Sequence, residues 1–234
     1  MNKTADRKRE YAYCFVVLFY VFVLEVFFKS RKGTEFLLRI AEKNFWYQYL
    51  DTVFYGLFAI LFLIVCMPRI RIWIRDFWER RRIILRDIVI AYVITLLLIA
   101  ITGLLLVYMG LKEGPAKEAV NLAAQREGLL EVLTVVLIGP FAEEMVFRGF
   151  LYDKIRGRLN TAKKLPIVMW VIIVSLIFML YHCEIADFSD IRIVLGYSPI
   201  FVEGLMMTAL YEKDRNLIAS LLLHIGINLL AIIS

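Results

Sequence analysis

Long runs of apolar residues constrain the fold of this chain more than any other feature of its sequence. The run over residues 88–109 contains no charged residue, and similar runs recur along the chain. A helix of about 20 apolar residues is long enough to cross the hydrocarbon core of a membrane. Hydrophobic residues make up 61% of the 234 residues, whereas a soluble globular domain contains about 45–50%. We therefore expect an all-α fold, a polytopic transmembrane bundle of about seven membrane helices.

The apolar runs predict the order of these helices. Gly139 and Pro140 interrupt the fourth run, and proline cannot donate a hydrogen bond to the preceding turn, so a kink or a restart is expected there. A restart would put Glu143 in the first turn of a new segment, where the helix dipole favours an anion. Residues 183–198 are expected to form an acidic, irregular loop. The expected spans are residues 11–28, 45–67, 88–109, 129–156, 167–182, 199–211 and 217–233.

Positive charge is concentrated in short segments between the apolar runs, which is the pattern of cytoplasmic loops. The basic segments 68–87, 156–166 and 213–216 all fall on one side of a membrane if the N-terminus is cytoplasmic, and the net positive connector 29–44 is the exception. The net charge is +6. Because this charge lies in such loops, we do not expect nucleic acid as a partner.

The most basic of these segments has an amphipathic pattern. Seven arginines fall within residues 69–86, and the apolar residues between them lie roughly on one helical face. This pattern is typical of a helix at the membrane surface, whose arginines could bind anionic lipid headgroups. We favour the simpler interpretation, in which the segment only sets the membrane topology.

Several ionisable side chains lie inside the apolar runs, where charged groups are costly and usually functional. Glu144 and Arg148 are four residues apart, so they share a helix face and are expected to pair. Glu143 points to a different face, and a buried carboxylate there is suited to act as a general base. The only two histidines, His182 and His224, fall in the fifth and seventh runs.

The two histidines have partners at the same spacing. Phe178 lies four residues before His182, and Asn228 lies four residues after His224. A lone histidine in a membrane helix usually has a structural role, but the coincidence of these groups on three apolar helices favours a shared cavity. The single acids near span ends are instead expected to have interfacial or structural roles. These acids are Glu25, Asp51 and Glu203.

These residues resemble the family of CAAX prenyl proteases and bacteriocin-processing intramembrane proteases, also called the abortive-infection family. Its three motifs are EExxxR, FxxxH and HxxxN, and they are matched here in the same order. The matching residues are Glu143-Glu144-xxx-Arg148, Phe178-xxx-His182 and His224-xxx-Asn228. The resemblance covers about residues 129–230, whereas residues 1–128 match only in being membrane helices. It implies one integral membrane domain, with N-terminal helices over residues 1–128, including the basic connector 68–87, and a catalytic core over residues 129–234.

The resemblance implies an intramembrane endopeptidase that cleaves a membrane-associated or lipidated peptide or protein. In this mechanism Glu143 and His182 activate a water, and His224 and Asn228 stabilise the oxyanion. Glu144 and Arg148 would shape the site. We expect no cofactor. The alternative is a zinc ion held by Glu143, His182 and His224, but the chain has no HExxH motif, so we favour the metal-free form.

Two other functions remain open at this point. A non-proteolytic immunity or scaffold protein of the same family would need the fold and a partner surface but not the chemistry of Glu143. A transporter could use buried acids and histidines as a proton relay. No pair of broken half-repeats in the sequence favours the transporter.

Overall fold

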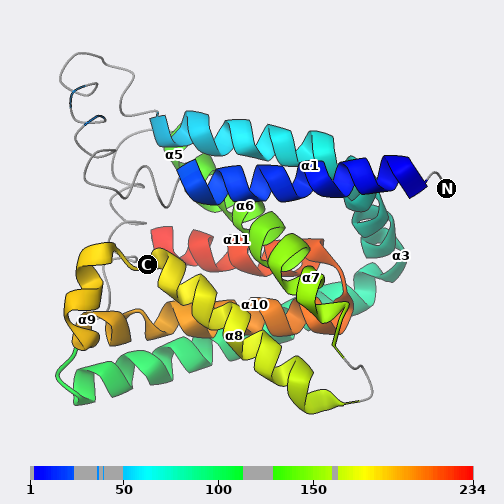
Figure 1. Cartoon of the computed structure of the whole chain (residues 1–234). Helices are drawn as coiled ribbons and strands as arrows, with labels where there is room; N and C mark the ends of the chain where they lie inside the picture. Colours follow the sequence, from blue (N-terminus) through cyan, green and yellow to red (C-terminus); the bar gives the residue numbers. More distant parts are fainter. Residues whose placement is uncertain are drawn as a thin grey trace.

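The computed structural model describes residues 3–23, 36, 39, 50–112, 129–159 and 163–233. Within these residues the structure contains helices and no strand, which confirms the all-α class. The connector 29–44 lies outside the described residues except at positions 36 and 39, so the expectation for its side of the membrane is not tested. In chain order (Figure 1) the elements are α1 (Lys3–Val21), α3 (Leu50–Tyr108), α5 (Leu129–Leu133), η3 (Thr134–Ile138), α6 (Gly139–Val146), η4 (Phe147–Tyr152), α7 (Asp153–Arg156), α8 (Lys164–His182), η5 (Ile185–Ser189), α9 (Ile191–Gly196), α10 (Ser198–Asp214) and α11 (Leu217–Ile233).

The longest element, α3, joins three segments that were expected to be separate. It is a single helix of 59 residues, with Pro68 inside it. The helix contains most of the second expected span, the arginine-rich segment and nearly all of the third span. Figure 1 shows that α3 bends, so that its first part packs beside α1 and its last part returns along the opposite side of the bundle. The arginine-rich segment is therefore helical, as expected, but it continues both neighbouring spans.

The expected number of about seven membrane helices is not confirmed. Among the described residues, two helices are long and apolar enough to cross a membrane, Thr52–Tyr108 within α3 and Lys164–His182. The helix Leu217–Ile233 is apolar but shorter. The count falls because two expected spans are joined in α3. It falls further because the run over residues 129–156 is divided into five short elements.

The segment expected to be irregular, residues 183–198, forms two short helices, η5 and α9. Their ends are stabilised by its acidic side chains. The backbone N–H of Glu184 donates to the Asp187 carboxylate at 2.8 Å, and the N–H of Arg192 donates to Asp190 at 2.9 Å. The acidic residues therefore act as helix caps, which satisfy backbone groups that a helix end leaves open.

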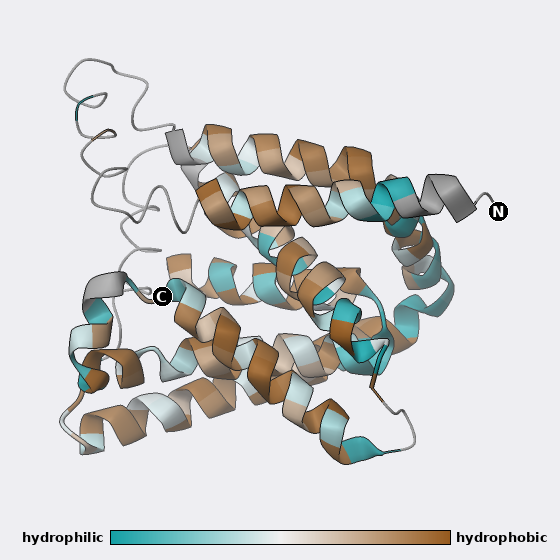
Figure 2. Ribbon diagram, in the orientation of Figure 1, coloured by the Kyte–Doolittle hydropathy of each residue, from teal (hydrophilic) through white to brown (hydrophobic). Residues whose placement is uncertain are grey.

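Polar residues gather at one end of the bundle (Figure 2), and ion pairs connect the helices there. Lys213 Nζ lies 2.6 Å from Asp87 Oδ2, which joins the end of α10 to α3. Arg156 Nη2 lies 2.6 Å from Glu212 Oε1, which joins α7 to α10. The three basic segments that were expected on one side of a membrane thus meet at the same end of the molecule.

Helices α8 and α10 approach each other closely at Gly204. A Cβ atom at this position would lie 3.0 Å from Cδ1 of Phe178 and 3.3 Å from the carbonyl oxygen of Ser175. Contacts this short would force the two helices apart, since one of them involves backbone. The absence of a side chain at Gly204 therefore sets how near α10 comes to Phe178.

Candidate active site

The helical run that carries the two adjacent glutamates widens on both sides of them. Glu143 and Glu144 lie in α6, and the flanking elements η3 and η4 are π-helical. The backbone keeps right-handed helical angles at Ile138 (φ −73°, ψ −47°) and Gly139 (φ −59°, ψ −57°). The helix is therefore not restarted at Pro140, and Glu143 does not lie in a first turn, contrary to that expectation. Such π turns are frequently found at functional sites.

The π turn and the proline together leave one backbone carbonyl in need of a donor. The N–H of Gly139 donates to the carbonyl of Thr134, one residue further back than in an α-helix. In the same register the carbonyl of Val135 would accept from Pro140, which has no N–H. Instead Nδ2 of Asn228, on α11, donates to Val135 at 2.9 Å. Asn228 thus satisfies this carbonyl and connects α11 to the run that contains α6.

Glu144 and Arg148 form a completely buried ion pair. Arg148 Nη1 donates to Glu144 Oε1 at 2.8 Å, and both side chains are 0% exposed. The same guanidinium donates to the carbonyl of Gly204 at 3.1 Å and to Thr208 Oγ1 at 3.3 Å. Its central carbon lies 4.6 Å from the ring centroid of Phe178, within the range of a cation–π contact. The pair that was expected from spacing alone therefore also connects η4 to α10 and α8.

His224 lies between the two glutamates. Its Nδ1 is 3.2 Å from Glu144 Oε1, and an ionised carboxylate only accepts hydrogen bonds, so Nδ1 carries the proton. Its Nε2 faces the other way, 3.8 Å from Glu143 Oε2. Glu144 thereby fixes the ring orientation that presents Nε2 to Glu143.

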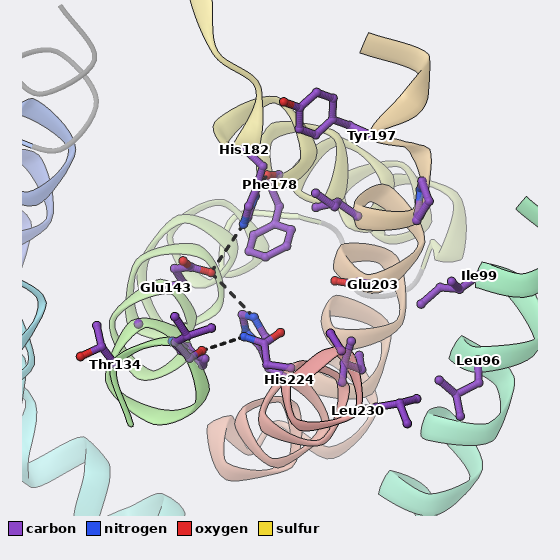
Figure 3. A pocket seen from close by; sticks show the side chains of 18 of the residues that line it. Leu96, Ile99, Thr134, Glu143, Phe178, His182, Tyr197, Glu203, His224 and Leu230 are labelled. Carbon is purple, nitrogen blue, oxygen red and sulfur yellow. Dashed lines mark hydrogen bonds and ion pairs between the residues drawn. The ribbon is translucent and has the colours of Figure 1, made fainter. Parts of the chain in front are cut away.

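His182 presents its Nε2 to the same oxygen of Glu143. Its Nδ1 lies 2.8 Å from the carbonyl oxygen of Phe178, which can only accept, so Nδ1 is the donor. Its Nε2 is 4.0 Å from Glu143 Oε2. Figure 3 shows the two imidazoles converging on this carboxylate from α8 and α11.

Phe178 holds both imidazole rings in place. Its ring centroid lies 4.7 Å from that of His182 and 5.9 Å from that of His224. It also packs edge-to-face against Phe147 at 5.0 Å. The side chain is 1% exposed, so its position is fixed by packing. This phenylalanine thus supports the site without offering a chemical group of its own.

A cavity of about 310 Å³ opens beside these groups. Four of the six expected site residues line it: Glu143, His182, His224 and Asn228. The other two, Glu144 and Arg148, are 0% exposed and lie behind Glu143 and His224. The structure therefore brings all six together. Apolar side chains such as Leu96, Ile99 and Ile200 form most of the remaining wall.

A comparison with protein families identifies the segment that carries this site. Residues 125–230 match the model of the type II CAAX prenyl endopeptidase Rce1-like family. This segment is similar to the Rce1-like family. It contains all three motifs and all six expected site residues. No curated protein and no solved structure matches the chain.

The similarity to the Rce1-like family supports a protease at the level of the family. A zinc ion held by Glu143, His182 and His224 was the alternative to metal-free chemistry. Among the described residues, no group of three or more His, Cys, Asp or Glu side chains is arranged so that it could hold a metal ion. No step proposed below involves a metal ion.

One residue of the cavity was not expected from the sequence. Glu203, on α10, lines the cavity, although the sequence favoured an interfacial or structural role for it. The signal that could have revealed it is a single carboxylate in an otherwise apolar run, which is costly in a membrane helix. The three motifs EExxxR, FxxxH and HxxxN do not include this position.

Proposed function

We propose that this protein is a multi-pass intramembrane endopeptidase that hydrolyses a peptide bond of a membrane-associated or lipidated peptide or protein. One observation carries the proposal. Glu143 Oε2 lies 3.8 Å and 4.0 Å from Nε2 of two histidines that come from different helices. All three groups line one cavity, together with Asn228.

The proposed reaction begins with a water bound among Glu143 and the two imidazoles. Atoms about 4 Å apart can both lie within about 2.8 Å of one water oxygen. Glu143 accepts a proton from this water while His182 orients it, and the hydroxide attacks the scissile carbonyl carbon. The C–N bond then breaks, and Glu143 returns the proton to the leaving nitrogen.

His224 and Asn228 are suited to stabilise the oxyanion that forms in this reaction. The Asn228 amide donates one hydrogen to Val135, and its second hydrogen can point to the cavity. His224 can donate from Nε2 when that nitrogen carries a proton. Preorganised donors of this kind stabilise charge that develops in the transition state.

We propose that the polar end of the bundle, with the N-terminal residues of α1, faces the cytoplasm. The support is the gathering of basic segments at this end, because cytoplasmic loops carry an excess of lysine and arginine. The arginine-rich part of α3, residues 69–86, would then lie at the membrane surface. Its exposed arginines are Arg69, Arg71, Arg75, Arg81, Arg82 and Arg86.

Anionic lipids should bind this exposed arginine surface. Vesicles with about 20% anionic lipid should raise the melting temperature of the reconstituted protein relative to neutral vesicles, since each basic residue near the surface contributes about 1 kcal/mol. The double substitution Arg81→Gln/Arg82→Gln should reduce this increase, and 0.5 M salt should abolish it by screening. An equal increase in wild type and variant would show that these arginines do not bind the lipid.

Peptide hydrolysis should not depend on a metal ion. Prolonged incubation with EDTA and 1,10-phenanthroline should leave the rate of the purified protein unchanged, because the proposed mechanism uses a carboxylate and an imidazole to activate water. A known zinc protease in the same detergent buffer is the control that the chelators work. Loss of activity that returns on addition of zinc would contradict the metal-free mechanism.

The proposal is tested by comparing wild type and Glu143→Gln, expressed at matched levels in the source cells. Newly formed peptide termini in the membrane fraction are then identified by mass spectrometry. We expect termini that are present with wild type and absent with the variant, and they would identify the substrate. Identical termini, together with an unchanged phenotype of the cells, would instead favour the non-proteolytic immunity or scaffold role.

A further inference from the structure

Glu203 faces the proposed catalytic residues across the cavity. Figure 3 shows its carboxylate pointing from α10 into the cavity whose other wall carries Glu143 and His224. The neighbouring residue, Gly204, packs against α8. Consecutive side chains of a helix point about 100° apart, so this packing turns the side chain of Glu203 toward the cavity.

The carboxylate of Glu203 has no hydrogen-bond or ion-pair partner among the residues that the structure describes. It lies near enough to His224 and Glu143 to interact electrostatically with both: His224 attracts it and Glu143 repels it. Among the residues that the structure describes, no lysine or arginine lines the cavity. Arg148, the nearest buried cation of the site, already pairs with Glu144.

A carboxylate in an apolar wall is costly unless another group neutralises it or donates hydrogen bonds to it. His224 is the cavity residue that attracts this carboxylate, but it already contacts Glu144 and faces Glu143. The cavity is therefore complementary to a further, positively charged ligand. The apolar residues beside Glu203, such as Ile99 and Ile200, suit the methylene groups of a long basic side chain. A free C-terminal carboxylate would be repelled at this position.

We propose that Glu203 is a specificity-determining residue that binds a lysine or arginine side chain of the substrate, close to the scissile bond. This inference rests on the proposed function, because it assigns a substrate class to the same cavity. Glu203 contributes selectivity between substrates, and Glu143 contributes the chemistry common to all of them.

The test uses the purified full-length protein in detergent and a synthetic peptide library with randomised residues around the cleavage site. Mass spectrometry of the products gives the residue preference at each position. Wild type should prefer lysine or arginine at one position by about tenfold over the uncharged isostere of similar size. Glu203→Gln should lose this preference while it still cleaves peptides that are neutral at that position. Glu203→Lys should shift the preference to aspartate or glutamate.

The control is Glu79→Gln, which removes one carboxylate from an exposed site on α3, where the Glu79 side chain is 67% exposed. It should keep the preference of wild type. If Glu203→Lys fails to fold, the near-isosteric Glu203→Gln still decides the question. Cleavage by wild type without a preference for a basic residue would overturn this inference but not the proposed function. An unchanged preference in Glu203→Gln would do the same. An equal loss of cleavage for all peptides in Glu203→Gln would also overturn it. Absence of any cleavage by wild type would overturn the proposed function as well.

Discussion

Replacing Glu143 with glutamine should lower the rate of peptide hydrolysis by about 10²–10⁴-fold, the usual contribution of a general base. Glutamine keeps the size of the side chain, but it cannot accept a proton from water. The melting temperature should change little, since the buried ion pair of Glu144 and Arg148 remains intact. The rate is measured under single-turnover conditions with the substrate found by the comparison of peptide termini.

The control for this prediction is Glu79→Gln, which should hydrolyse the substrate at the rate of wild type. A second comparison is His182→Ala, which should also be slow, because the proposed mechanism uses Nε2 of His182 to orient the same water. A Glu143→Gln protein as active as wild type would exclude Glu143 as the general base. It would also contradict the proposal that this cavity is the active site.

Replacing Arg148 with alanine should destabilise the protein by about 3–5 kcal/mol, the usual cost of removing one partner from a buried ion pair. The substitution leaves Glu144 buried at 0% exposure and removes three hydrogen bonds that hold η4, α6 and α10 together. Equilibrium unfolding in detergent measures the change. Activity should fall too, since Glu144 orients the imidazole of His224.

Arg86→Ala is the matched control for this substitution. Arg86 is 62% exposed and its partner Asp87 also pairs with Lys213, so we expect a cost below about 1 kcal/mol. Equal stability of the Arg148→Ala and Arg86→Ala proteins would show that the buried pair does not stabilise the fold. A further variant, Arg148→Lys, should recover only part of the loss, because an ammonium group cannot reproduce the fork of a guanidinium.

Local spacing predicted much of the fold and of the candidate site. The last helix, α11, has the expected bounds of residues 217–233. The i, i+4 rule predicted the pairing of Glu144 with Arg148, which the structure contains. In these cases the relevant geometry lies within a single helix, so the sequence alone determines it.

Features that depend on contacts between helices could not be predicted in this way. The continuity of α3 through Pro68 was missed, because hydropathy separates a charged stretch from its apolar neighbours even where the helix continues. The bond from Asn228 to Val135 depends on the π register of η3, which no spacing rule gives. Glu203 was expected to have an interfacial or structural role. Its direction could not be predicted, because it depends on how Gly204 packs against Phe178.

The two bonds from α11 to the run of η3 and α6 have a mechanical consequence. His224 reaches Glu144 and Asn228 reaches Val135, so α11 is attached to this run on both sides of Glu143 along the chain. A tilt of α11 would carry Glu143 and His224 together as one rigid unit. Helices can then separate elsewhere to admit a peptide while the reacting groups keep their alignment. Distances between labels on α6 and α11 should accordingly stay constant when substrate binds.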